Sequence, residues 1–149
     1  MSLQKDIMEA MKTAMRAKDS KTLEALRAVK SAIIIAQTET GSKEDLTEDQ
    51  ELKILQKLVK QRKDSATIFS EQNREDLATP ELEQAEVISQ FLPAQMSEEE
   101  VAKIVEEIIV QTGASSMKDM GKVMGIAGGK LAGKTDGKTI STIVKQRLS

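Results

Sequence analysis

The sequence contains no cysteine and no histidine. Their absence excludes disulfides, zinc sites of the usual Cys/His type, thiol nucleophiles and imidazole acid–base catalysis. No run of about 18 apolar residues is present, so no membrane-spanning segment is expected. The charged N-terminus lacks the apolar core of a signal peptide, which favours a cytoplasmic location. We therefore expect no metal, no cofactor and no membrane association.

Aromatic residues are nearly absent, since Phe69 and Phe91 are the only two. The apolar side chains are instead Leu, Ile, Val, Ala and Met, a set dominated by residues that favour helices. No alternation of apolar and polar residues persists, and the strand-like run at residues 33–35 lies within a helical pattern. The composition therefore predicts an all-α protein.

Apolar residues recur at spacings of three and four along most of the chain, which is typical of amphipathic helices. Four such segments precede the Leu92-Pro93 pair, and three shorter ones follow it. We predict a four-helix N-terminal domain over residues 1–93 and a three-helix C-terminal domain over residues 97–149. Residues 94–96 are the candidate linker.

Cap signals divide the N-terminal domain into its helices. Asp19-Ser20 is a predicted cap, residues 41–43 form a predicted polar loop, and Thr47 with Gln50 forms a predicted capping box. After a polar break at residues 72–74, Thr79-Pro80 predicts the start of the fourth helix. An earlier start near Arg74, with Pro80 inside a bent helix, is the alternative.

The C-terminal domain carries similar signals. Ser97 with Glu100 is a second predicted capping box, Gly113 ends that helix, and residues 116–119 start the next one. Asp136 is predicted to cap the last helix.

The tail of the chain is rich in glycine and lysine. Seven of the eight glycines fall between residues 113 and 137, and residues 117–149 carry seven basic and two acidic residues, a net charge of +5. A local basic zone indicates a polyanionic partner. Gly121 and Gly125 share a helix face, which indicates either close helix–helix packing or an exposed backbone surface beside Lys118 and Lys122. Met117, Met120 and Met124 are predicted core residues.

Residues 128–135 (GGKLAGKT) match the phosphate-binding loop pattern. A genuine loop of this kind follows a buried strand of a parallel sheet, whereas residues 119–127 are predicted to be helical. We interpret the match as a flexible loop with lysines that face phosphates.

Other charged groups have ordinary explanations. The basic run at residues 57–63 is predicted to be a solvated helix face, with contact to a nucleic-acid backbone as the alternative. The carboxylates at residues 98–100 suit a helix N-terminus, and Ser115-Ser116 beside Lys118 suits a cap better than a nucleophile. No catalytic residues are assigned.

Several motifs together resemble the GatB/YqeY family, in particular its stand-alone YqeY-like members. In the tail they are residues 119–125 (DMGKVMG), 133–134 (GK), 136–138 (DGK) and 143–145 (IVK), and in the first half 61–65 (QRKDS), 73–77 (NREDL), 91–93 (FLP) and 97–100 (SEEE). Proline is common in the family between residues 126 and 130, where this chain has Ala127-Gly128-Gly129. This departure is expected to loosen a loop.

The resemblance implies a helical module shared with the C-terminal part of the GatB component of the tRNA amidotransferase, where it contacts tRNA outside the active site. It also implies the family label of a carbon–nitrogen ligase that uses glutamine as amido donor, although the chain lacks the catalytic portions.

Three hypotheses follow from the residues and the resemblance. The first is a non-catalytic module that binds tRNA or another structured RNA. In this hypothesis Gly121 and Gly125, with Lys118 beside them, let the RNA approach the protein backbone closely. The lysines expected to contact phosphates are Lys122, Lys130, Lys134 and Lys138. Without aromatic neighbours, such binding depends on phosphates and shape. The second is a protein-interaction accessory on an amidotransferase or another translation component, and the third is an amidotransferase-type enzyme.

Overall fold

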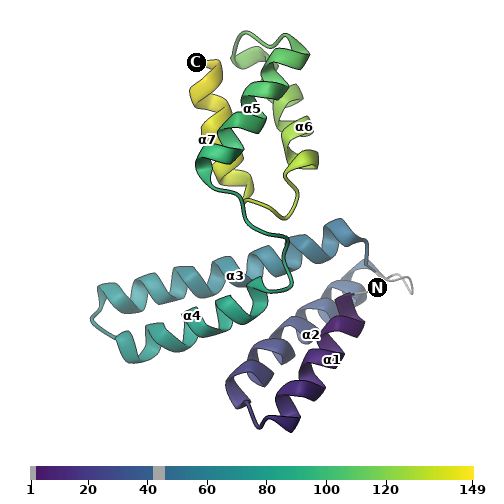
Figure 1. Ribbon diagram of the computed structural model, residues 1–149, viewed down its shortest axis with the longest axis vertical. Coiled ribbons are helices and arrows are strands. Elements are labelled where there is room, and N and C mark those ends of the chain that lie inside the picture. Colours follow the sequence, from purple (N-terminus) through teal and green to yellow (C-terminus); the bar gives the residue numbers. More distant parts are fainter. Residues whose placement is uncertain (1–2, 42–45) are drawn as a thin grey trace. The chain divides into compact units, whose positions relative to one another are not determined.

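The computed structural model describes residues 3–41 and 46–149, and every regular element in these ranges is helical (Figure 1). The predicted all-α class is therefore confirmed. The elements are α1 (Leu3–Arg16), α2 (Ser20–Thr40), α3 (Glu48–Glu71), α4 (Glu75–Ser89), α5 (Glu98–Thr112), the 3-10 turn η1 (Met117–Asp119), α6 (Met120–Lys130) and α7 (Gly137–Leu148). Gly41 ends α2 with a φ of +63°, while Ser42 and Lys43 of the predicted loop lie outside the described residues.

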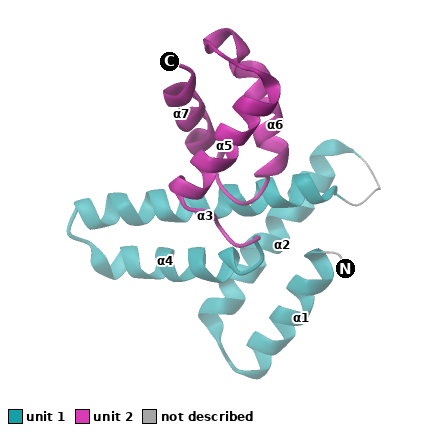
Figure 2. Ribbon diagram, turned by 45° about the horizontal axis from the view of Figure 1, so that its top comes forward, with its two compact units in different colours: residues 1–92 teal, residues 93–149 magenta. Residues whose placement is uncertain are grey.

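The helices form two compact units, residues 1–92 and residues 93–149, which we call unit 1 and unit 2 (Figure 2). Unit 1 contains α1 to α4, and unit 2 contains α5 to α7 with η1. Each unit has its own cluster of buried apolar side chains.

The core of unit 1 is aliphatic, with Ile7, Leu26, Leu55 and Ile88 almost fully buried. The antiparallel helices α3 and α4 run side by side, α2 packs against α4, and α1 packs against α2 (Figure 1). A polar contact joins α3 to α4, because the Arg62 guanidinium donates a hydrogen bond to the Gln84 side chain at 3.0 Å, while a second bond to the Leu58 carbonyl at 3.1 Å holds it on α3. This residue of the basic run therefore has a structural role.

The core of unit 2 lies between three short helices that all contact one another. Its fully buried side chains come from each of them: Val101, Val105 and Ile108 of α5, Val123 and Ala127 of α6, and Val144 of α7. The chain enters the unit along the α6–α7 loop, where the Met96 N–H donates to the Lys134 carbonyl at 3.0 Å. The Gln95 amide donates to the Gly133 carbonyl at 2.7 Å. These two residues of the predicted linker thus bond within unit 2.

Most predicted caps are confirmed. The side chains of Asp19, Thr47, Ser97 and Asp136 each accept a backbone N–H in the first turn of the helix that follows, and the Thr47–Gln50 capping box is complete. Gly113 ends α5 with a φ of +70°, a left-handed conformation that glycine adopts without strain.

The predicted start of α4 at Thr79-Pro80 is wrong, and the alternative start near Arg74 is correct. Asn73, with a φ of +60°, ends the preceding turn, and α4 begins at Glu75. Two acidic residues, Glu75 and Asp76, occupy the first turn, where the helix dipole favours negative charge. Pro80 therefore lies inside the helix.

The cap of α2 makes the stability of the folded protein dependent on pH. The Asp19 carboxylate accepts the Thr22 hydroxyl at 2.6 Å and the Thr22 backbone N–H at 3.1 Å. The first of these bonds, and then the second, lower the pKa of Asp19 from its ordinary 3.8. Because the pKa is lower in the folded state, the cap stabilises the fold fully above the unfolded pKa. This stabilisation is lost as pH falls through the folded value.

We expect the melting temperature of the wild type to fall relative to that of Asp19→Asn as the pH drops below the ordinary Asp19 pKa of 3.8. Asparagine keeps the acceptor oxygen but does not titrate. Thermal unfolding of both proteins, followed by circular dichroism from about pH 7 to about pH 2, measures the difference. A difference that stays constant across this range contradicts the expectation.

Candidate nucleic-acid interface

The turn before α6 is built from local caps. The Ser116 hydroxyl oxygen accepts the backbone N–H of Lys118 at 3.3 Å, and the Asp119 carboxylate accepts the Ser115 N–H at 3.0 Å. Ser116 is therefore a cap residue, as expected, whereas Ser115 contributes only its backbone N–H. Met117, by contrast, was expected in the core but is 44% exposed, because η1 turns it outward, whereas Met120 and Met124 pack against the core of unit 2.

Helix α6 has a buried face and a face without side chains. Val123 and Ala127 are fully buried, while Gly121, Gly125, Gly128 and Gly129 are exposed. A Cβ atom placed on any of these four glycines would meet, apart from its chain neighbours and the nearby backbone of α6 itself, no atom within 4 Å. No helix among the described residues packs on these glycines, so of the two alternatives the structure shows the exposed backbone surface. The core side chains project from the opposite face.

Gly121, Gly125 and Gly129 follow one another at a spacing of four, and we call them the glycine ridge. Residues at this spacing are neighbours on one helix face. Each glycine costs a helix up to about 1 kcal/mol relative to alanine. No packing of the described residues offsets this cost. The ridge therefore weakens α6 without serving the core of unit 2.

Lys122 and Lys130 lie beside the glycine ridge on the same helix, with Ile126 between them, and all three are exposed. The two lysines are eight residues apart, which corresponds to about 12 Å along a helix axis. Within the part of the chain that the structure describes, neither ammonium has a carboxylate within 4 Å. The outer surface of α6 thus combines bare backbone with two unpaired positive charges.

The remaining site lysines lie elsewhere in unit 2. Lys118 is exposed on η1, Lys134 is exposed in the α6–α7 loop, and Lys138 lies in the first turn of α7. Lys138 and Glu98 line an open hollow of about 240 Å³ between α5 and α7. The structure therefore gathers Gly121, Lys122, Gly125 and Lys130 on one helix, and it places Lys138 in a different groove beside an acidic residue.

The segment around residue 128 is not the loop expected from the sequence. Residues 128–130 form the last turn of α6, and the chain leaves the helix at Leu131. The glycines here do not loosen a loop, because a segment without proline continues the helical hydrogen bonds. Gly129 also belongs to the ridge. It is not among the residues predicted from the sequence, although its spacing of four from Gly125 places it on the same helix face.

Other candidate groups are occupied by structural contacts. Lys60 forms an ion pair with Asp64 at 2.7 Å, and Arg147 pairs with Glu106 at 3.0 Å. Among residues 3–41 and 46–149, no cluster of three acidic residues is arranged to hold a metal ion. The helices in these ranges are too short or too polar to cross a bilayer.

Comparison with known proteins gives three similarities. The sequence profile of the family described as "Yqey-like protein" matches residues 4–148. The E subunit of glutamyl-tRNA(Gln) amidotransferase from Thermococcus gammatolerans is 34% identical over 109 residues, which are 70% of this chain and 17% of that protein. Altered inheritance of mitochondria protein 41, mitochondrial, from Clavispora lusitaniae is 37% identical over 92 residues, which are 60% of this chain and 52% of that protein. The chain thus spans about half or less of the length of these relatives.

The open space at the glycine ridge makes a stability prediction. We expect Gly125→Ala to raise the free energy of unfolding by up to about 1 kcal/mol, since alanine favours the helix and meets no neighbour. Denaturation in urea measures it. Gly113→Ala is the matched control and should destabilise, because the φ of +70° disfavours a side chain. Loss of stability in Gly125→Ala would show that the ridge is packed.

Proposed function

Because the chain belongs to the YqeY-like family, we propose that it is a non-catalytic module that binds structured RNA, with tRNA the first to test. One observation carries the proposal: the glycine ridge of α6 is open and lies beside Lys122 and Lys130, whose ammonium groups pair with no carboxylate of the described residues. Lys118 on η1 precedes this helix and would add positive charge at its start, whereas Lys134 and Lys138 lie in the α6–α7 loop and in α7, so any phosphate they contact would lie outside the glycine ridge.

The chemistry of the surface suits a sugar–phosphate backbone. Lysines bind phosphates as point charges and release counterions from the RNA. A helix face without side chains lets a ribose or phosphate approach the protein backbone closely. Base stacking is not part of the proposal, because unit 2 contains no aromatic residue and unit 1 contains only Phe69 and Phe91. Binding would therefore follow the shape and charge of the RNA more than its sequence.

The choice of tRNA is supported by the relative whose name includes glutamyl-tRNA(Gln) amidotransferase. The similarity covers 17% of that protein, so its amidotransferase activity is not carried over to this chain. The cytoplasmic location likewise stays a prediction, since another relative has "mitochondrial" in its name.

We expect binding of total tRNA that weakens as salt rises from about 50 mM to about 200 mM, measured by filter binding. The double variant Lys122→Gln/Lys130→Gln should bind more weakly and should flatten the slope of log K against log salt by roughly two, because two phosphate contacts are lost. Lys103→Gln, an exposed lysine of α5 away from the ridge, is the matched control and should bind like wild type.

Two outcomes contradict the phosphate-contact proposal. One is the absence of binding near 50 mM salt, and the other is binding whose affinity does not change with salt. If Lys103→Gln lowers the tRNA affinity as much as Lys122→Gln/Lys130→Gln does, the contact is not specific to α6.

The second candidate function is a protein-interaction accessory on an amidotransferase or another translation component. The observation that favours it is Ile126, which is 36% exposed between Lys122 and Lys130 and would suit an apolar residue of a partner helix. Gly125→Leu separates the two functions in a pull-down and a filter-binding assay. Loss of protein partners with intact RNA binding supports the accessory, and loss of RNA binding alone supports the RNA module.

A further inference from the structure

A groove in unit 1, between α1 and α2, is not used by the proposed RNA contact. It contains a hollow of about 180 Å³ lined by three residues of each helix: Gln4, Ile7 and Met8 of α1, and Lys30, Ile33 and Ile34 of α2. The floor is apolar, because Ile7 and Ile33 are almost fully buried. On the walls, Met8 is 51% and Ile34 is 49% exposed. Two large apolar side chains are thus left half in water around a hollow.

The size of the hollow indicates what it can hold. Small-molecule sites usually have volumes of about 300–1,000 Å³, so this hollow is too small for a nucleotide or a similar ligand. A single aliphatic side chain of a partner helix would fit it, and a side chain buried in such a pocket commonly anchors a protein interface. Met15, seven residues after Met8 on the same helix face, extends the apolar wall and is 53% exposed.

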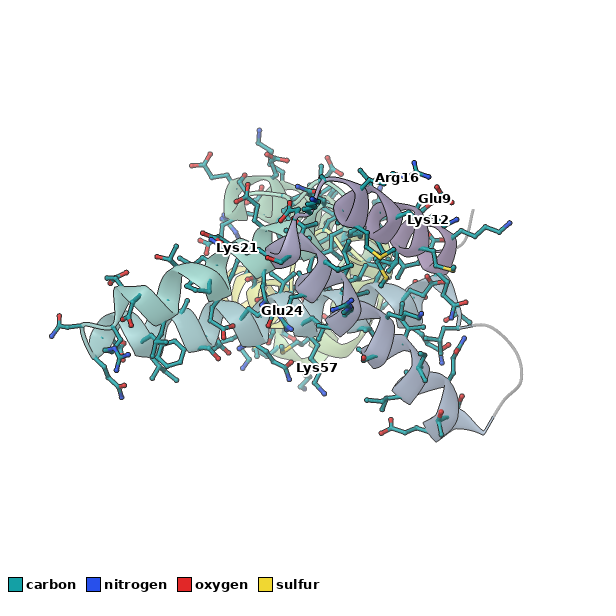
Figure 3. All side chains as sticks on the ribbon, turned by 90° about the horizontal axis from the view of Figure 1, so that it is seen from below. Glu9, Lys12, Arg16, Lys21, Glu24 and Lys57 are labelled. Atoms are coloured by element: carbon teal, nitrogen blue, oxygen red, sulfur yellow. The ribbon has the colours of Figure 1, made fainter. Side chains whose placement is uncertain are left out.

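The rim of the groove is positively charged. Lys30 lines the hollow, and Arg27 lies one turn before it on α2. On α1, Lys12 follows Met8 at a spacing of four and lies beside Glu9, whereas Arg16, nine residues after the buried Ile7, lies on the far side of the helix (Figure 3). Glu9 pairs with Lys12 at 3.4 Å, whereas Arg27 and Lys30 have no carboxylate within 4 Å in the described ranges. The occupant should therefore carry acidic groups around one aliphatic side chain.

Helix α4 presents such a surface. It contains five acidic residues and no lysine or arginine. Its outward face carries Glu75, Leu82 and Glu86 at spacings of seven and four, all exposed, with Leu82 at 50%. Neither Glu75 nor Glu86 has a cation within 4 Å among the described residues. The opposite face of α4 is buried through Ala85 and Ile88, so the acidic face points away from its own unit.

We propose that a second copy of this chain occupies the α1–α2 groove with its α4, placing Leu82 in the hollow and Glu75 and Glu86 against the basic rim. Each copy has both surfaces, so two copies can make the contact twice around a two-fold axis. The dimer would contain two identical contacts, each with one helix in one groove. Because each contact is small and charged, we expect a dimer that forms at high protein concentration and weakens as salt rises.

The test is the mass of the full chain in solution, measured by sedimentation equilibrium from about 1 µM to about 1 mM at low salt. We expect a shift from the 16.3 kDa monomer to twice that mass. Leu82→Asp should raise the dimer dissociation constant at least about tenfold. Ile68→Asp is the matched control, since Ile68 of α3 is 52% exposed and belongs to neither surface, and this variant should dimerise like wild type.

A charge exchange tests the pairing directly. Lys30→Glu and Glu86→Lys should each weaken the dimer about tenfold, and the double variant should recover most of that loss because the opposite charges face each other again. A monomer at every concentration, a dimer unaffected by Leu82→Asp, or no recovery in the double variant would each overturn the proposal. All of these residues lie in unit 1, so the tRNA affinity of the variants reports independently on the α6 surface.

Discussion

Burial of aliphatic side chains on one face of each helix is the interaction on which the structure depends. With only two aromatic residues, both cores are built from Leu, Ile, Val and Ala, and a fully buried side chain of this size contributes about 1.5–3 kcal/mol. Such a core is satisfied by one face of each helix. The core therefore does not constrain the outer faces, and those of α4 and α6 differ: α4 is rich in acidic residues, whereas the outer face of α6 is rich in glycine.

The outer face of α6 replaces side chains with open backbone. Four glycines in an 11-residue helix lower its intrinsic stability, and no contact within the described part of the chain explains them. The helix persists because Val123, Ala127 and Leu131 are buried on the other side. A surface that reduces stability without serving the fold is typical of a binding site. The adjacent lysines give the outer surface of α6 a positive charge.

Several features could be predicted from the sequence because they depend on neighbours along the chain. The caps at Thr47 and Asp136 follow from side chains that reach backbone groups three residues away. The start of α4 is harder to predict from the sequence. Pro80 is a strong local signal for a helix start, but the preceding turn ends at Asn73 and the helix already begins at Glu75. The exposure of Met117 depends on a 3-10 turn, which shifts the side chain from the face that helical spacing predicts.

The sequence by itself determined the helical class, most helix ends and the concentration of glycine and lysine in the tail, since these depend on composition and short spacings. Only the tertiary structure decided whether Gly121 and Gly125 face a neighbouring helix or open space, because the glycine pattern is the same in both cases. It also decided that Lys122 and Lys130 share the exposed face of α6 while Lys138 lies beside Glu98. Contacts between residues distant in sequence set these placements, and no local pattern records them.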